Sequence, residues 1–185
     1  MDKDLISLHS LLDGRTALVT GSGRGIGAAT AEALARAGAN VIVNYIRNDQ
    51  AASSVVARIK AFGGNAIKIR ADVTDRNDVQ NLRERTAEFF GSVDTLVLNA
   101  NGMQDRHACA LIDHPIEDLT ARVSQQLSAV LTPCRTFLPD MVKAKYGCII
   151  VISSGLSQRP LSGFASGCIA KAAIDAVVRS LGLEL

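Results

Sequence analysis

The chain has 185 residues, the size of one domain, and residues 1–185 are expected to form a single unit. Hydrophobic residues make up 48% and charged residues 21%, with a net charge of +2 and no basic block, which excludes a disordered chain and argues against a nucleic-acid partner. The chain has no apolar run near the roughly 18 residues that span a bilayer, no signal-peptide pattern and no CxxC pair, so we expect a cytoplasmic protein without a membrane partner or a metal site.

Short apolar runs alternate with helical patterns along the chain. The expected strands are 16–20, 41–45, 66–69, 95–98 and 148–152. The expected helices are 26–37, 50–62, 75–90, 116–145 and 164–185. Strands with so little polar alternation are buried on both faces, which predicts an α/β fold with a doubly wound parallel sheet covered by helices.

Local signals refine two of these helices. Thr74 precedes the helix over 75–90 and is expected to cap it. Pro133 and Pro139 fall inside the long helix over 116–145, and each removes a backbone donor. We therefore expect a bend there, or a helix that begins near Pro133.

The first expected strand leads directly into a glycine-rich turn, Thr20-Gly21-Ser22-Gly23-Arg24-Gly25-Ile26-Gly27. Gly21 allows a tight turn, Gly25 lets the backbone approach a pyrophosphate, and Gly27 lets the following helix pack close to the strand. The amino end of that helix offers free N–H groups and the positive end of its dipole to phosphates. A strand, a turn of this kind and a helix together predict a dinucleotide-binding site.

The spacing TGxxxGxG resembles the short-chain dehydrogenase/reductase family, and 3-oxoacyl-acyl-carrier-protein reductases in particular. The resemblance extends from Thr20 to Leu185. Three further matching motifs follow later expected strands: Asp72-Val73, Asn99-Ala100-Asn101-Gly102 and Ile152-Ser153-Ser154. The last match is Lys171, in the final expected helix. It implies a Rossmann fold, an oxidoreductase with a small-molecule substrate, and a homodimer or homotetramer formed through the last two long helices.

The resemblance also implies a nicotinamide cofactor. Relatives that use NAD usually carry an acid at the end of the second strand, where this chain has Asn44. Asn44 brings no charge to repel a 2′-phosphate, and Arg24 and Arg47 can supply positive charge to it, so we expect NADP(H). The alternative is that Arg47 is only a solvated loop charge. The implied cofactor-binding residues are Gly21, Ser22, Gly23, Arg24, Gly25, Ile26, Gly27, Asn44, Tyr45, Arg47, Asp72, Val73, Asn99, Ala100, Asn101, Gly102 and Lys171.

The catalytic set of the family is only partly present. In the family, a Tyr exchanges the proton at the substrate oxygen, a Lys four residues later assists it, a Ser orients the substrate and an Asn holds a water. Ser154 and Lys171 match and are the expected catalytic residues, but Gly167 stands at the Tyr position. Enoyl reductases of the family place their Tyr seven residues before the Lys, where this chain has Phe164, and Gln126 stands at the Asn position.

Two hypotheses follow from this set. The first is an NADP(H)-dependent oxidoreductase acting on a carbonyl, an alcohol or an activated double bond, with Ser166, Cys168 or a water beside Lys171 replacing the Tyr hydroxyl. Tyr146 is a weaker candidate for that replacement. The second is a cofactor-binding pseudoenzyme, or a protein with a non-redox role, because Gly167 carries no hydroxyl.

The last helix is the final element expected in this chain, whereas the family fold continues into a sixth strand. We therefore expect a record cut short or a truncated relative, with an unpaired edge on the fifth strand and poor stability without a partner. An apolar helix face, suited to a core or to an interface, is expected from Ile174, Val177, Val178, Leu181 and Leu183.

Overall fold

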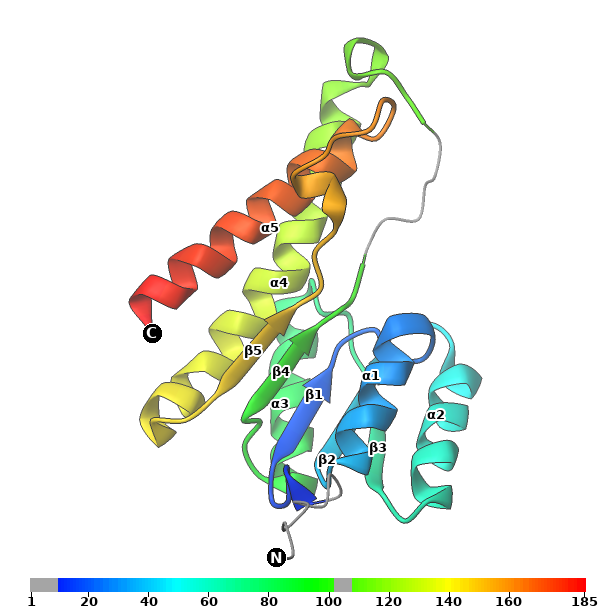
Figure 1. Ribbon diagram of the computed structural model, residues 1–185, viewed down its shortest axis with the longest axis vertical. Coiled ribbons are helices and arrows are strands. Elements are labelled where there is room, and N and C mark those ends of the chain that lie inside the picture. The colour runs from blue at the N-terminus through cyan, green and yellow to red at the C-terminus, as the bar shows by residue number, and fades with distance from the viewer. Residues whose placement is uncertain (1–9, 102–107) are drawn as a thin grey trace, which may run out of the picture.

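A computed structural model describes residues 10–101 and 108–185. Its strands and helices are β1 (Thr16–Val19), α1 (Gly25–Arg36), β2 (Asn40–Tyr45), α2 (Asp49–Ala61), β3 (Asn65–Arg70), α3 (Arg76–Phe90), β4 (Thr95–Leu98), α4 (Ile116–Ala144), β5 (Cys148–Val151) and α5 (Ala165–Glu184), with short 3₁₀ helices η2 (Leu111–Asp113) and η3 (Gly155–Ser157). The strands form one parallel sheet in the order β3-β2-β1-β4-β5 (Figure 1). The predicted doubly wound α/β fold is confirmed.

β1 lies in the middle of the sheet and is buried along its whole length. Leu18 pairs with Ile42 of β2 on one side and with Leu96 of β4 on the other. Because helices cover both faces at this point, β1 has no solvent face on which a polar residue could alternate. That placement explains the apolar run in the sequence.

The helices form two layers of unequal size. α1 and α2 cover one face, where Ala31 and Val55 pack against β1 and β2. α3, α4 and α5 cover the other face, where Leu82, Phe137 and Ile174 join a second core cluster. The larger layer therefore reaches β5, whereas the smaller layer packs mainly on the β3-β2-β1 side of the sheet (Figure 1).

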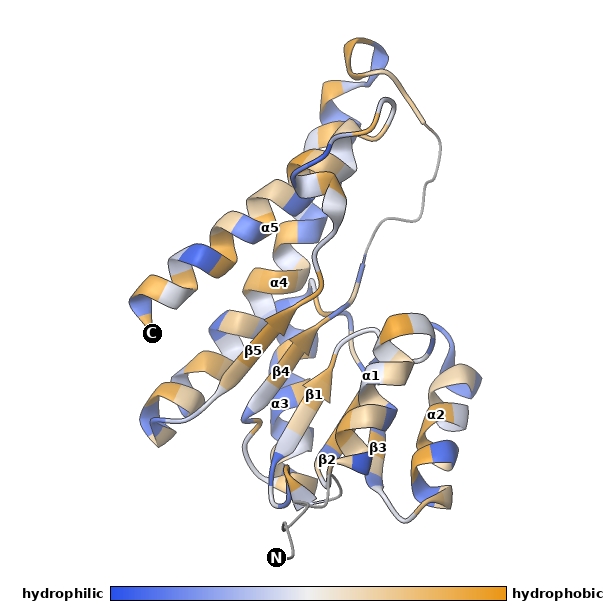
Figure 2. Cartoon of the chain, in the orientation of Figure 1, coloured by the Kyte–Doolittle hydropathy of each residue, from blue (hydrophilic) through white to orange (hydrophobic). Residues whose placement is uncertain are grey.

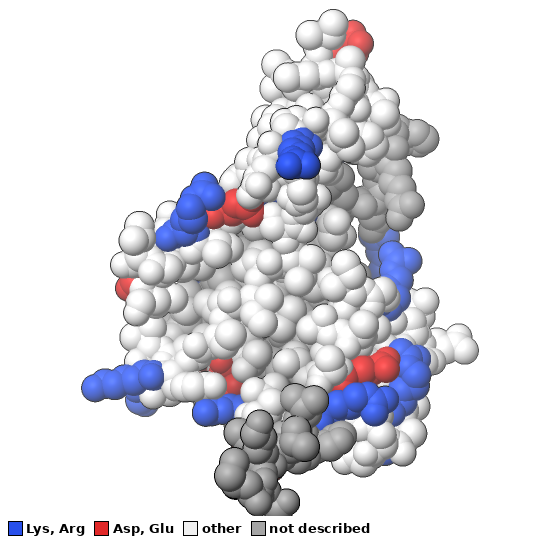
Figure 3. Space-filling view, viewed as in Figure 1, with Lys and Arg blue, Asp and Glu red and all other residues white. Residues whose placement is uncertain are grey.

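β5 is consequently the least covered strand. Cys148 and Ile150 are exposed, while Ile149 and Val151 are half-buried on the side of α4 and α5. Within the described residues no strand pairs with the outer edge of β5. Figure 2 shows β5 as hydrophobic along its length, and Figure 3 shows that the charged residues of this face lie mainly around its margins.

An open groove follows this edge. It has a volume of about 720 Å³ and lies between β5 and the carboxyl-terminal halves of α4 and α5. Its lining is largely apolar and includes Leu138, Met141, Ile149, Val151, Val178 and Leu181. On the expected apolar face of α5, Ile174 is buried, and Val177 and Leu181 pack against the core. Val178 and Leu183 are exposed, because no described element covers the end of α5.

Of the predicted helix signals, the Thr74 cap is wrong and the proline prediction is narrowed to one of its two alternatives. The amino end of α3 is capped by Asp75, whose Oδ1 accepts from the backbone N of Asn77 and Asp78. The Thr74 hydroxyl instead donates to Asp72 Oδ1, so it is not available as the cap. α4 runs as one helix through Pro133 and Pro139, so no helix begins near Pro133, and a bend at these prolines stays a prediction.

Among the described residues, no helix is long and apolar enough to cross a membrane. The same residues contain no cluster of three or more His, Cys, Asp or Glu side chains that could hold a metal ion.

Candidate functional site

The predicted site residues gather at one edge of the sheet. The glycine-rich turn follows β1, Asn99 follows β4, and Ser154 follows β5, so all three come after the carboxyl ends of neighbouring parallel strands. From β1 the chain crosses toward β2, whereas from β4 it crosses toward β5 on the other side. Connections that diverge in this way leave a crevice at the switch point, where ligands bind in open α/β sheets.

The glycine-rich turn can be built only with glycines at two of its positions. Gly21 has a φ of 63°, and a Cβ there would lie 3.0 Å from the Ala100 Cα. A Cβ on Gly27 would lie 2.5 Å from Asn99 Nδ2 and 2.9 Å from the carbonyl oxygen of Gly21. Gly25, by contrast, has a φ of 57° and no described atom within 4 Å of its Cβ position. The turn is thus packed against the β4 loop on one side and open at Gly25.

The amino end of α1 is free to receive an anion. Arg24 occupies the N-cap position in an extended conformation, and among the described residues no side chain caps the first amides of the helix. Arg24 and Gly25 are exposed, and the Ile26 side chain is 63% exposed. Uncapped N–H groups at a helix start, beside an arginine, form a phosphate-binding geometry.

Thr20 joins this turn to the loop after β4. Its buried hydroxyl accepts from the backbone N of Asn99 and of Ala100, each at 2.9 Å. In return, Asn99 Nδ2 donates to the carbonyl oxygens of Thr20 (3.0 Å) and Gly21 (3.2 Å). Thr20 was not among the predicted site residues. Its position as the first residue of the TGxxxGxG motif could have identified it.

Two predicted cofactor residues have buried side chains with structural partners. Asn44 Oδ1 accepts from the Gly21 backbone N at 3.1 Å, and its Nδ2 donates to the carbonyl oxygens of Ile69 (3.4 Å) and Ala71 (3.0 Å). Ser22 Oγ donates to the Val19 carbonyl oxygen at 2.7 Å. Both side chains therefore stabilise the backbone of the turn through hydrogen bonds. Direct contact of either side chain with a cofactor stays a prediction.

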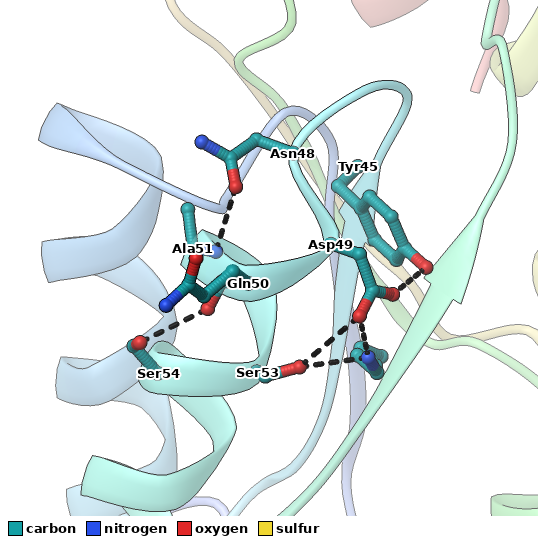
Figure 4. A network of polar contacts seen from close by, with 8 residues as sticks. Tyr45, Asn48, Asp49, Gln50, Ala51, Ser53 and Ser54 are labelled. Carbon is teal, nitrogen blue, oxygen red and sulfur yellow. Dashed lines mark hydrogen bonds and ion pairs between the residues drawn. The ribbon is translucent and has the colours of Figure 1, made fainter.

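A polar network surrounds the end of β2 (Figure 4). The Tyr45 hydroxyl donates to Asp49 Oδ1, and Lys68 Nζ lies 2.5 Å from Asp49 Oδ2 and 2.7 Å from Ser53 Oγ. The hydrogen bond from Lys68 holds the pKa of Asp49 below its ordinary value, and the hydrogen bond to Asp49 raises the pKa of Tyr45. Sequence reasoning missed Asp49 and Lys68, which are close together only because β3 lies beside β2.

The same network lies close to the glycine-rich turn. A Cβ on Gly23 would come within 3.5 Å of the Ala52 backbone N, so the first turn of α2 borders the phosphate-binding turn. Asn48 caps that helix by accepting from the Ala51 backbone N at 2.9 Å, and Asp49 points instead toward Tyr45 (Figure 4). Arg47 is exposed in the loop just before this helix.

The remaining cofactor predictions lie on the loops after β3 and β4. Asp72 Oδ1 accepts from both the backbone N and the hydroxyl of Thr74, and Val73 is buried. Asn101 is exposed, and its Oδ1 accepts from Nε2 of the buried Gln126 on α4. Gly102 lies outside the described residues.

Lys171 and Ser154 both lie at the end of β5. Lys171 is 8% exposed, and its Nζ donates to the Ile152 carbonyl oxygen at 2.8 Å. Burial lowers the pKa of Lys171, and the charge of Asp175 partly opposes this shift. Ser154 is exposed, and its Oγ accepts from the Leu156 backbone N at 3.3 Å. The structure thus brings both predicted catalytic residues to one short segment of chain.

The candidates for the missing hydroxyl are placed very differently. Two candidates, Ser166 and Cys168, flank Gly167 in the first turn of α5. All three residues are buried and lie about one helical turn before Lys171. Tyr146 precedes β5, at the opposite edge of the sheet, where its ring stacks against Arg15 at 3.7 Å. Tyr146 as a catalytic substitute is therefore wrong.

A nicotinamide dinucleotide fits this set of groups. The open position at Gly25, the uncapped start of α1 and the arginine at the N-cap suit a pyrophosphate. The buried ammonium of Lys171 has one hydrogen bond to Ile152 and two further N–H groups that suit ribose hydroxyls.

Comparisons with known proteins agree with this arrangement. A family model described as short chain dehydrogenase matches residues 15–185. The chain is 36% identical over 173 residues to 2,5-dichloro-2,5-cyclohexadiene-1,4-diol dehydrogenase LinX of Sphingobium indicum, covering 94% of this chain and 68% of that protein. It is 37% identical over 174 residues to a 3-oxoacyl-[acyl-carrier-protein] reductase of Synechocystis, covering 94% and 69%. It is also 37% identical to versicolorin reductase stcU of Emericella nidulans, covering 94% and 64%.

Proposed function

The chain belongs to the short-chain dehydrogenase family, and we propose that it is an NADP(H)-dependent oxidoreductase that acts on a small carbonyl or alcohol compound, or on an activated double bond. The observation that carries this proposal is the joint placement of an open phosphate-binding turn and a buried lysine at one switch point of the sheet. The relatives are named as dehydrogenases and reductases of chemically different small molecules, which supports the reaction class and leaves the substrate open.

The charges around α2 support the phosphorylated cofactor. Asn44 is neutral at the end of β2, and Arg47 is exposed in the loop before α2. Arg24 is exposed at the N-cap of α1, next to Gly23, which borders the first turn of α2. The one acid in the first turn of α2, Asp49, is engaged by Lys68. With this carboxylate compensated, a 2′-phosphate meets less repulsion, and arginines suit its oxygens.

Replacing Lys68 tests this preference. Lys68→Met leaves Asp49 uncompensated and is expected to weaken NADPH binding several-fold, with a smaller effect on NADH, because only NADPH carries the extra phosphate charge. Lys60→Met is the matched control, because Lys60 is a lysine on α2, the helix that carries Asp49, and makes no described contact with Asp49. Equal losses in the two variants would contradict the proposed role of the network, and the difference should shrink at high salt.

The chain's own groups divide the work in the proposed reaction. A bound nicotinamide dinucleotide supplies or accepts the hydride. The glycine-rich turn and the start of α1 hold its phosphates, and Lys171 binds its ribose. Ser154 Oγ accepts from the Leu156 backbone N, which leaves its hydroxyl hydrogen to donate to the substrate oxygen. A water held by Lys171 exchanges the proton that a tyrosine exchanges elsewhere in the family.

The direct test is a binding and turnover experiment. The change in NADPH fluorescence is expected to reach a plateau as protein is added, which shows saturable binding. Cofactor oxidation is then followed over a panel of ketones, 3-oxoacyl thioesters and enoyl thioesters. Lys171→Ala is the control for turnover. The absence of saturable NADPH binding would contradict the proposal at its first step, and turnover no higher than that of Lys171→Ala would contradict it at the second.

A second candidate function is a cofactor-binding pseudoenzyme. It is favoured by the joint departures at Gly167, Phe164 and Gln126, since a general acid typically contributes 10²–10⁴-fold to the rate. Gly167→Tyr separates the two functions, with Gly167→Phe as a control of equal bulk and no hydroxyl. A strong gain in turnover that is seen in Gly167→Tyr but not in Gly167→Phe favours the pseudoenzyme. Turnover in the wild type that exceeds both variants favours the active enzyme.

We also propose that the protein is a homodimer or homotetramer built through α4 and α5. An open groove along α4 supports this, with Leu119, Val123, Leu127 and Leu131 recurring every four residues and Ile169 of α5 beside them. Leu131 and Ile169 are 39% and 41% exposed, which is unusual for a solvent face. Sedimentation of Leu131→Glu is expected to show smaller assemblies than sedimentation of the wild type.

A further inference from the structure

Asp175 makes contacts that place it next to the candidate catalytic residues. It lies four residues after Lys171 on α5, so the two side chains lie on one face of the helix. Its Oδ1 accepts from Ser153 Oγ at 2.5 Å, across 22 positions of sequence. The hydrogen bond from Ser153, with a smaller contribution from the nearby Ser157 hydroxyl, holds the pKa of Asp175 below its ordinary value, so Asp175 is a charged acceptor at neutral pH.

These two serines flank Ser154. Ser153 comes directly before it, and Ser157 closes η3, the short turn in which Ser154 is the N-cap. Ser157 Oγ also donates to the Ser154 carbonyl oxygen at 2.9 Å. Asp175 therefore accepts from the residue directly before Ser154 and lies near Ser157, while its own backbone is in the same helix as Lys171.

We propose that Asp175 is a positioning residue that holds the Ser154 turn against α5 and so fixes Ser154 relative to Lys171. The inference rests on the proposed function, because it assigns Asp175 to the same site. The second link between these parts is the bond from Lys171 Nζ to the Ile152 carbonyl oxygen at 2.8 Å. Together the two bonds attach two consecutive residues just after β5, Ile152 and Ser153, to one face of α5, directly before Ser154.

The charge of Asp175 gives the proposal a second consequence. Among the described residues, Asp175 is the one charged side chain that shifts the pKa of Lys171, and it raises it. Arg179, one turn further along α5, is the other cation that acts on Asp175. Removing the carboxylate charge therefore lowers the pKa of Lys171 further, and Lys171 loses its proton at a lower pH than in the wild type.

Two variants separate position from charge. Asp175→Ala removes the acceptor for Ser153 and the charge together. Asp175→Asn keeps a side-chain oxygen for Ser153 but removes the charge. Glu184→Gln is the matched control, because Glu184 is the other acid on α5 and lies at its exposed end.

The experiment measures hydrogen exchange of peptides covering 152–158 and NADPH binding between pH 7 and 10. Asp175→Ala is expected to speed exchange in this segment about fivefold, as the loss of a net hydrogen bond does. Asp175→Asn is expected to exchange like the wild type but to lose NADPH binding at a lower pH. Glu184→Gln is expected to change neither.

Each remaining outcome decides the proposal. Exchange in Asp175→Ala no faster than in Glu184→Gln would overturn the positioning role, and an alkaline limb in Asp175→Asn that matches the wild type would overturn the charge effect. If Asp175→Ala fails to fold, exchange in Ser153→Ala, which removes the donor of the same bond, decides the positioning role. A wild type without NADPH binding would contradict the proposed function, while the exchange measurement would still test the tie between Asp175 and the Ser154 turn.

Discussion

The two ends of the sheet differ in how completely the chain covers them. At the β3-β2-β1 end, α1 and α2 close one face and α3 the other, and β1 is buried throughout. At the β5 end, α4 and α5 cover one face, while Cys148 and Ile150 on the other are exposed. The first end therefore stabilises itself with its own helices, and the second leaves apolar surface open.

The chemistry divides along the same line. The glycine-rich turn, with its links to Thr20 and Asn44, belongs to the well-covered end and keeps the pattern that phosphate binding requires. The departures at Gly167 and Gln126 lie on α5 and α4, at the open end. Cofactor binding and turnover are thus expected to respond separately to substitution, and the predictions below probe that separation.

The largest expected effect comes from Gly27→Ala in the glycine-rich turn. The new Cβ would lie 2.9 Å from the Gly21 carbonyl oxygen and the Ser22 Cα, so backbone must move. Overpacking of this kind costs about 1–3 kcal/mol, and we expect NADPH binding to be lost as the turn shifts. Chemical denaturation and NADPH titration measure the two effects.

Gly182→Ala is the control for that substitution. Gly182 lies inside α5 with no described atom within 4 Å of its Cβ position, so alanine is expected to stabilise the protein by about 0.5–1 kcal/mol. Normal NADPH binding by Gly27→Ala would contradict the role given to the tight turn.

Thr20→Val tests the junction between the two ends. It removes the oxygen that accepts from the backbone N of Asn99 and Ala100, at nearly constant volume. Leaving these partly buried donors without a protein partner is expected to cost about 1 kcal/mol of the free energy of unfolding and to weaken NADPH binding. Thr20→Ser keeps the hydroxyl and is expected to retain binding. If valine and serine behave alike, the hydroxyl does not join the loops.

Much of the fold could be predicted because its signals are local. The strand over Thr95–Leu98 agrees with the sequence prediction, and the ends of α1 and α2 agree within a residue. The glycine-rich turn was equally readable, since the conformations of Gly21 and Gly25 depend on neighbours in sequence. Apolar period and turn residues carry that information directly.

What could not be predicted depends on which elements become neighbours in space. Lys68 reaches Asp49 across 19 positions, and Ser153 reaches Asp175 across 22. Neither pair has a spacing that marks it as a contact. The cap of α3 shows the same limit on a small scale: Thr74 and Asp75 both suit the position, and the contact of Thr74 with Asp72 decides between them.

A smaller effect is expected from the ion pair that joins α3 to α4. Arg83 Nε and Nη2 donate to Asp140 Oδ2 and Oδ1 at 2.8 and 2.9 Å. This pairing lowers the pKa of Asp140, so its contribution is present above the unfolded pKa near 4 and is lost as pH falls through the lower folded pKa. Because both side chains are partly exposed, Asp140→Asn is expected to cost only about 0.5–1 kcal/mol at pH 7.

Unfolding of Asp140→Asn and the wild type is compared at pH 7 and at successively lower pH. Their difference in unfolding free energy is expected to shrink as the pH falls through the lowered pKa of Asp140. Glu32→Gln serves as the control, since Glu32 pairs with Arg58 within the α1–α2 layer and not between the two ends of the sheet. A difference that persists in acid would mean that Asp140 acts through packing and not through its charge.

The smallest effect on stability is expected from Ile150→Lys on the open face of β5. Ile150 is 44% exposed, so a lysine there can extend into solvent and should change the unfolding free energy by less than about 0.5 kcal/mol. A charge on an exposed strand also opposes edge-to-edge pairing, so self-association measured by light scattering should fall. Ile149→Lys is the contrast, because Ile149 packs against the core beneath α4 and α5 and its replacement should destabilise the fold. If Ile150→Lys destabilised the protein as strongly as Ile149→Lys, β5 would be covered on both faces in solution, and the difference between the two ends of the sheet would not hold.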